Sequence, residues 1–132
     1  MPAVKPIPKV VRYRGDTAPL PRTLYDRDTG AVKALTGVTE IILTVRDYTE
    51  DATVMLERKY TDDEIRIVDA ALGTFVVLWD ADEMAGLVPS ERGYDYDIEV
   101  TFPGDEVGDD DQIQTTEKGR FVVKADVTRP AV

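Results

Sequence analysis

The sequence predicts an all-β protein that folds as an antiparallel sandwich of about seven short strands with one short helical turn. Three observations support this prediction. Apolar and polar residues alternate with a period of two in several segments, turn-forming residues separate those segments, and no long segment has the period of an amphipathic helix. A chain of 132 residues suits one domain, and a domain of this size buries about two-thirds of the surface that its unfolded chain exposes.

Residues 1–9 are predicted to form an extended arm, because Pro2, Pro6 and Pro8 favour extended backbone and lack hydrogen-bond donors. Such an arm adds little to a sandwich by itself, so we expect it to serve assembly rather than stability. In that role Pro6, Ile7 and Pro8 would supply the apolar contact with a neighbouring subunit.

The sandwich is expected to span residues 10–128, followed by a short tail at 129–132. Its predicted strands occupy residues 10–13, 39–46, 53–60, 65–68, 74–79, 94–102, 113–116 and 121–127. The Glu-Lys-Gly sequence at 117–119 predicts a turn between the last two of these strands.

The clearest strand is 94–102, where two sets of residues alternate. The apolar set, predicted to face the core, is Tyr94, Tyr96, Ile98, Val100 and Phe102. The acidic set is Asp95, Asp97 and Glu99. It is either an ordinary solvent-exposed sheet face or a docking face for a basic neighbour.

Residues 74–79 are almost continuously apolar, which is typical of a strand buried on both faces. Trp79, at the end of this run, is predicted to lie in the core, with a sugar-stacking surface as the alternative. The next segment, 80–87, predicts one or two helical turns. Asp80 or Asp82 would cap this helix and Glu83 would lie in its first turn; the alternative is the carboxylate pair of a glycosidase.

The acidic loop at 104–111 is predicted to be a solvated hairpin tip. Calcium binding is the alternative, with Asp109, Asp110 and Asp111 as candidate ligands, because a glycine-containing loop with carboxylate oxygens suits that ion. The loop lacks the regular ligand spacing of a known calcium-binding loop. We therefore predict no metal and no cofactor.

The composition restricts the chemistry further. The chain has no Cys, no His and a single serine, Ser90, which excludes Ser-His-Asp and Cys-His catalytic centres. The formal net charge of −10 would repel nucleic-acid phosphates and anionic membranes. No apolar run approaches the roughly 20 residues of a membrane-spanning helix. The sequence therefore predicts a protein that is not an enzyme and binds neither nucleic acid nor membrane.

The order of the turn signals resembles the immunoglobulin-like N-terminal domain of phage baseplate upper proteins and related phage tail modules. The matching motifs are Gly15-Asp16-Thr17, the turn at 26–30, Leu35-Thr36-Gly37, the alternating strand at 41–45, the apolar strand at 74–79 and Gly93-Tyr94. Within this pattern Arg14-Gly15-Asp16 is structural rather than an integrin signal, because Gly15 permits a bend and Asp16 can bond to nearby backbone.

The resemblance implies an immunoglobulin-like sandwich that acts as a structural subunit of a tailed-phage virion, at the tail tip or baseplate. Its partners would be other virion proteins in a symmetric homo-oligomer or hetero-oligomer, assembled in the host cytoplasm. Two alternatives remain open: a carbohydrate- or cell-surface-binding module, and a capsid decoration protein.

Overall fold

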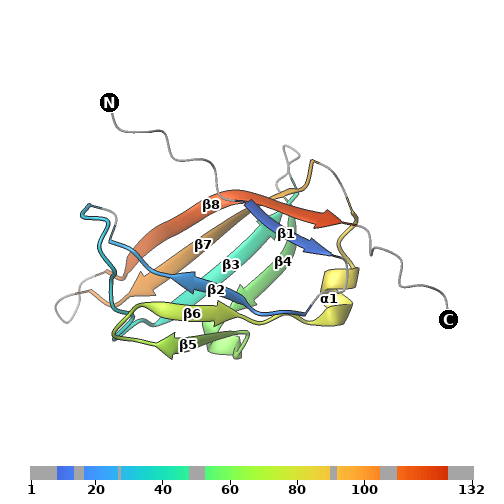
Figure 1. Cartoon of the computed structure of the whole chain (residues 1–132). Helices are drawn as coiled ribbons and strands as arrows, with labels where there is room; N and C mark the ends of the chain where they lie inside the picture. Colours follow the sequence, from blue (N-terminus) through green and yellow to red (C-terminus); the bar gives the residue numbers. More distant parts are fainter. Residues whose placement is uncertain are drawn as a thin grey trace.

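Two β-sheets packed face to face form the protein (Figure 1). The computed structural model describes residues 9–13, 17–26, 28–47, 53–89, 92–104 and 110–124. Its strands are β1 (Lys9–Tyr13), β2 (Leu20–Thr23), β3 (Glu40–Arg46), β4 (Val54–Lys59), β5 (Ile65–Asp69), β6 (Thr74–Val77), β7 (Tyr94–Phe102) and β8 (Gln112–Lys124). A 3₁₀ turn, η1 (Tyr60–Asp62), follows β4, and a short helix, α1 (Ala81–Ala85), joins β6 to β7. The all-β sandwich predicted from the sequence is confirmed.

The strand order has the connectivity of an immunoglobulin-like sandwich. One sheet has the order β1-β8-β7-β3-β4 and the other has the order β2-β6-β5. Several pairs of consecutive strands therefore lie in different sheets, as in Greek-key sandwiches. All strand pairs are antiparallel except β1 and β8, which run parallel. The predicted antiparallel arrangement therefore holds for the described strand pairs other than that of β1, the edge strand of the larger sheet.

The core lies between the two sheets, as the alternation predicted. Ile41, Leu43 and Val45 on β3 are fully buried. The predicted inner face of β7 is buried from its start to Val100, while Phe102 is only half-buried at the strand end. The smaller sheet contributes the buried side chains Leu20, Ile65, Phe75 and Val77.

The apolar segment at 74–79 differs from its prediction. Phe75 and Val77 are buried, but Thr74 and Val76 on the opposite face are only half-buried. The reason is that β6 lies in a sheet whose outer face has no further layer of strands above it. Trp79 lies beyond the strand and is buried, which confirms its place in the core.

A single long strand replaces the predicted turn at 117–119. β8 runs without a break for 13 residues from Gln112 to Lys124. Opposite Ile98 and Glu99, β8 places Glu117 and Thr115, so Thr116 is an extra, unpaired residue. Such a bulge shifts the alternation by one residue, which is why the sequence pattern breaks here without a turn.

The connection from α1 to β7 is fixed by a cap and a tyrosine. Asp80 caps α1 as predicted, because its side chain accepts hydrogen bonds from the backbone N–H groups of Asp82 and Glu83. The Tyr94 hydroxyl accepts a bond from the Val88 N–H at 2.9 Å and donates one to the Val88 carbonyl at 3.0 Å. This tie to backbone a few residues upstream is the tyrosine corner of immunoglobulin-like sandwiches.

Candidate assembly surfaces

The acidic set of β7 lies on the outer face of the larger sheet, between β3 and β8. Asp97 is paired with Arg46 on β3, with Arg46 Nη1 2.5 Å from a carboxylate oxygen. The register also places Arg46 and Arg120 on either side of Asp95, and Lys118 beside Asp97. Asp95 and Asp97 therefore lie beside cations of their own sheet, whereas Glu99 lies between Ile42 and Thr115, and the surface is mixed in charge rather than uniformly acidic.

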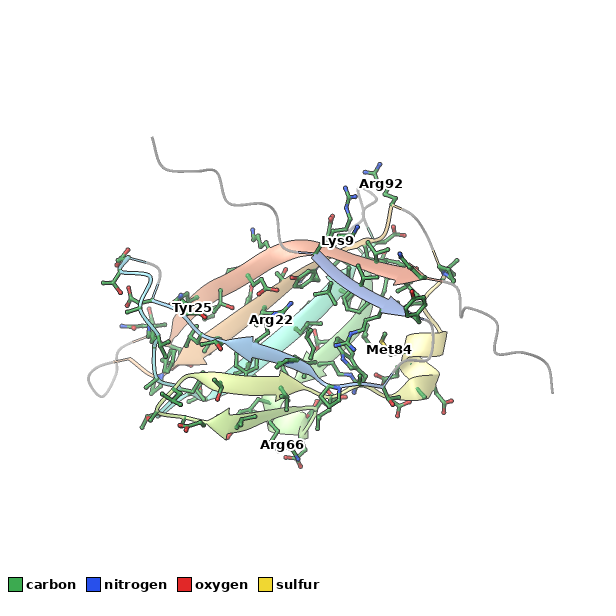
Figure 2. The ribbon with its side chains drawn as sticks, in the orientation of Figure 1. Lys9, Arg22, Tyr25, Arg66, Met84 and Arg92 are labelled. Carbon is green, nitrogen blue, oxygen red and sulfur yellow. The ribbon has the colours of Figure 1, made fainter. Side chains whose placement is uncertain are left out.

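The β1 end of the same outer face is basic and partly apolar. Lys9 on β1 is the register partner of Arg120 on β8, and both are exposed (Figure 2 labels Lys9). Val11 and Tyr13 alternate with the buried residues of β1 and are 41% and 44% exposed. β1 also begins at Lys9, which the sequence had placed at the end of the arm.

A groove of about 610 Å³ runs along β2, the edge strand of the smaller sheet. We call it the β2 groove; its lining residues include Pro21, Arg22, Tyr25, Val76, Ile98 and Glu117. Arg22 Nε lies 3.1 Å from both oxygens of Glu117 on β8, so an ion pair crosses the open side of the sandwich (Figure 2). Tyr25 is 55% exposed at this groove.

The Glu117 carboxylate also accepts a hydrogen bond from the hydroxyl of Tyr96. Burial of the phenol raises the pKa of Tyr96, and the bond to the negative Glu117 raises that pKa further. The Glu117 carboxylate therefore interacts with the guanidinium of Arg22 and the phenol of Tyr96, both within the same chain. No sequence pattern predicts this cluster, because Arg22 and Glu117 are 95 residues apart.

A second ion cluster closes the end of the sandwich near α1. Arg58 on β4 has a side chain that is only 5% exposed, and its Nη1 lies 2.5 Å from Glu64 Oε2. Its Nη2 lies 2.7 Å from Glu83 Oε2 as a close ion pair without hydrogen-bond alignment. Glu83 and the cap Asp80 therefore have structural contacts, which accords with the predicted role of this acidic segment in the helix.

The free edges of the smaller sheet differ in their hydrogen-bonding capacity. The Leu78 N–H bonds to the Glu64 carbonyl, so by alternation along an antiparallel pair the backbone of Ile65 and Ile67 points away from β6. At the other edge the Leu24 N–H bonds to the Gly73 carbonyl, which by the same alternation turns Pro21 outward from β2. Because proline has no N–H, the β2 edge lacks a hydrogen-bond donor at Pro21, whereas the β5 edge keeps its donors.

Some of the other residues singled out from the sequence lie within the described part of the chain and some lie outside it. Pro6, Ile7 and Pro8, the Arg14-Gly15-Asp16 sequence and Asp109 lie outside the described residues. Asp110 and Asp111 are exposed. Within the described ranges, no three Asp, Glu, His or Cys side chains are grouped so that they could hold a metal ion. None of the described helices is long and apolar enough to cross a membrane.

Across the described residues, these features define an immunoglobulin-like sandwich with ion pairs inside the fold, a mixed-charge outer face and a β5 edge that keeps its backbone hydrogen-bonding groups. No family model matches the chain, and no curated protein matches it.

Proposed function

We propose that this protein is a non-enzymatic structural subunit of a tailed-phage virion, at the tail tip or baseplate, that acts through protein–protein assembly. The sequence motifs that resemble phage baseplate and tail modules supply the phage context. An assembly role is supported by a contrast between charged side chains that are paired within the fold and backbone groups of a strand edge that have no partner strand. Arg58 and Glu117 form their ion pairs within the fold, whereas β5 has a strand on one side only in the described part of the chain.

In this role the sandwich is a rigid block that binds neighbouring virion proteins in a symmetric oligomer. The outer face that carries Asp95, Asp97 and Glu99 offers both signs of charge, which favours one orientation of a complementary partner over others. Exposed Val11 and Tyr13 at the β1 end add apolar contact area.

The test is to locate the chain in particles. Antibodies against the purified protein are applied to tailed particles produced from a genome that encodes it, and bound antibody is imaged by electron microscopy. We expect label at the distal end of the tail. Label over the head would favour a capsid decoration protein, and a chain absent from purified particles would overturn the virion proposal.

The carbohydrate-binding alternative is favoured by one feature, the exposed ring of Tyr25 in the β2 groove. Aromatic faces pack against sugar rings, while the nearby Arg22 and Glu117 could bond to hydroxyl groups. A glycan array probed with the protein tests this. Binding that Tyr25→Ala abolishes and Tyr13→Ala preserves would support the alternative, and an array without signal would remove it.

A further inference from the structure

We propose that the open edge of β5 binds residues 3–7 of a second copy of this chain, which add to the smaller sheet as a further strand. We call the outward backbone of Ile65 and Ile67 the β5 edge. The inference rests on the assembly function and specifies its partner and its contact.

The β5 edge is suited to strand addition because its hydrogen-bonding groups are intact. Ile65 and Ile67 each present an N–H and a carbonyl away from β6, and β5 contains no proline. β5 is the last strand of its sheet in the part of the chain that the structure describes. An extended segment laid beside it gains main-chain hydrogen bonds of the kind that drive strand addition in peptide recognition.

Two other edges are less suited. At β2 the outward residue Pro21 has no N–H, and its carbonyl already accepts a hydrogen bond from Arg22 Nη1 at 2.9 Å. At β4 the outward backbone of Lys59 is occupied on both sides, because its N–H bonds to the Glu64 side chain and its carbonyl accepts from the Glu64 N–H. The β5 edge is the one of these three that keeps donors and acceptors free in consecutive outward positions.

The N-terminal sequence has the pattern of a strand that pairs on one side only. Its prolines are at even positions, Pro2, Pro6 and Pro8, while Ala3, Lys5 and Ile7 at odd positions keep their N–H groups. Alternate residues of a strand direct their N–H groups to opposite edges, so the odd residues can pair with β5 while the prolines lie on the other edge. Proline also biases the preceding residue toward extended backbone, which applies to Lys5 and Ile7.

The acidic residues at the two ends of β5 are complementary to the N-terminal segment, while exposed Arg66 in the middle is the one basic residue of the strand. Exposed Asp62 and Asp63 precede β5, and exposed Asp69 ends it. The N-terminal segment carries Lys5 and is followed by Lys9, with no acidic residue among the first nine. Val68, 62% exposed on β5, provides apolar surface beside the edge.

The partner is a second copy because β5 is remote from the start of its own β1. Lys9 begins β1, the edge strand beside β8 in the larger sheet, whereas β5 lies beyond β2 and β6 in the other sheet (Figure 1). To reach β5 from Lys9, the chain must cross from one sheet to the other, which lie about 10 Å apart, and then cross two strand spacings of about 4.8 Å each. Eight extended residues span at most about 29 Å, so that path would leave too little chain to pair along β5.

Self-association of the full-length chain, measured by sedimentation velocity over a concentration series, tests the proposal. Ala3→Pro removes a pairing N–H with little change in side chain, and Val4→Pro removes an N–H that faces away from β5. We expect Ala3→Pro to weaken association about threefold to tenfold, the equivalent of one hydrogen bond, and Val4→Pro to change it less than about twofold. A wild-type chain that stays monomeric, or the opposite order of the two variants, overturns the inference.

The receiving edge is tested separately. Asp62→Lys should weaken association and reduce its salt dependence, whereas Asp82→Lys on α1, a control with the same charge change, should leave both unchanged. A chain carrying Ala3→Pro with Ile7→Pro has an intact β5 edge, and a chain carrying Asp62→Lys with Ile67→Pro has an intact N-terminal segment. Each should be monomeric alone, and their mixture should form dimers. Failure of the mixture to associate, with both variants folded by circular dichroism, overturns the edge assignment.

These outcomes are distinct from failure of the proposed function. A chain found at the tail tip that does not self-associate leaves the virion role standing and removes only the β5 contact. A self-associating chain that is absent from particles does the reverse.

Discussion

The two faces of β7 illustrate how one strand divides stability from surface chemistry. On the inner face Tyr96, Ile98 and Val100 are almost completely buried. On the outer face Asp97 and Glu99 are partly exposed, and Asp97 lies beside Lys118 of the neighbouring strand. Substitutions at neighbouring positions of β7 should therefore affect different properties. A substitution on the inner face should change the unfolding free energy, and one on the outer face should change binding to a partner.

The largest effect is expected from Ile98→Ala. The substitution removes buried methyl and methylene groups and leaves a cavity, so the unfolding free energy should fall by about 2–5 kcal/mol. Chemical denaturation measures this. An effect below that of an outer-face substitution on the same strand would contradict the division of the two faces.

Tyr94→Phe should have the next largest effect. The variant keeps the ring but leaves the N–H and carbonyl of Val88 without the hydroxyl that bonds both of them. Because unsatisfied backbone groups cost about 1–3 kcal/mol each when buried and less where water can reach them, we expect a loss of about 1–2 kcal/mol. Thermal unfolding of Tyr94→Phe beside Tyr13→Phe, an exposed control, separates this tie from a general effect of losing a phenol.

Tyr96→Phe should alter stability chiefly at alkaline pH. The pKa of Tyr96 is raised in the folded protein by burial and by Glu117, so the unfolded chain releases the phenolic proton first, near pH 10. The stability tied to the neutral phenol is fully present below that pH and is lost as the pH rises toward the folded-state pKa. The wild-type protein should therefore lose stability more steeply above pH 10 than Tyr96→Phe; parallel curves would refute this.

Asp97→Ala should have the smallest effect, under about 0.5 kcal/mol, because its pair with Arg46 lies at the surface, where solvent and salt screen the interaction. Denaturation midpoints at low and high salt should nearly coincide for the variant and the wild type. A loss comparable to that of Ile98→Ala would mean that the outer face carries the fold.

The alternating strands were predictable because their patterns reflect local geometry. Ile41, Leu43 and Val45 recur at every second position, and a period of two determines which side chains face the core. β8 was less predictable, since the bulge at Thr116 puts the residues before it out of phase with those after it. No short-range pattern signals a bulge of this kind.

The polar clusters were not predictable, because they depend on tertiary contacts. Arg58 is a charged residue in a strand, and only the packing of α1 and the segment before β5 against it shows that it is buried between two carboxylates. The Arg22–Glu117 pair likewise requires the two sheets to meet. The outward direction of the Ile65 and Ile67 backbone follows from strand register, which the sequence does not specify.

The parallel pairing of β1 with β8 has a mechanical consequence. The chain enters the pair at Lys9 and leaves it at Lys124, which lie at opposite ends of the five paired positions. A tensile force between these two points slides the strands along each other, so the hydrogen bonds of the pair are loaded together rather than broken one after another. A domain joined to its neighbours through these points would resist stretching, because the force loads the strand pair in shear. The β5–β6 hairpin, pulled at its two ends, would instead unzip one hydrogen bond at a time.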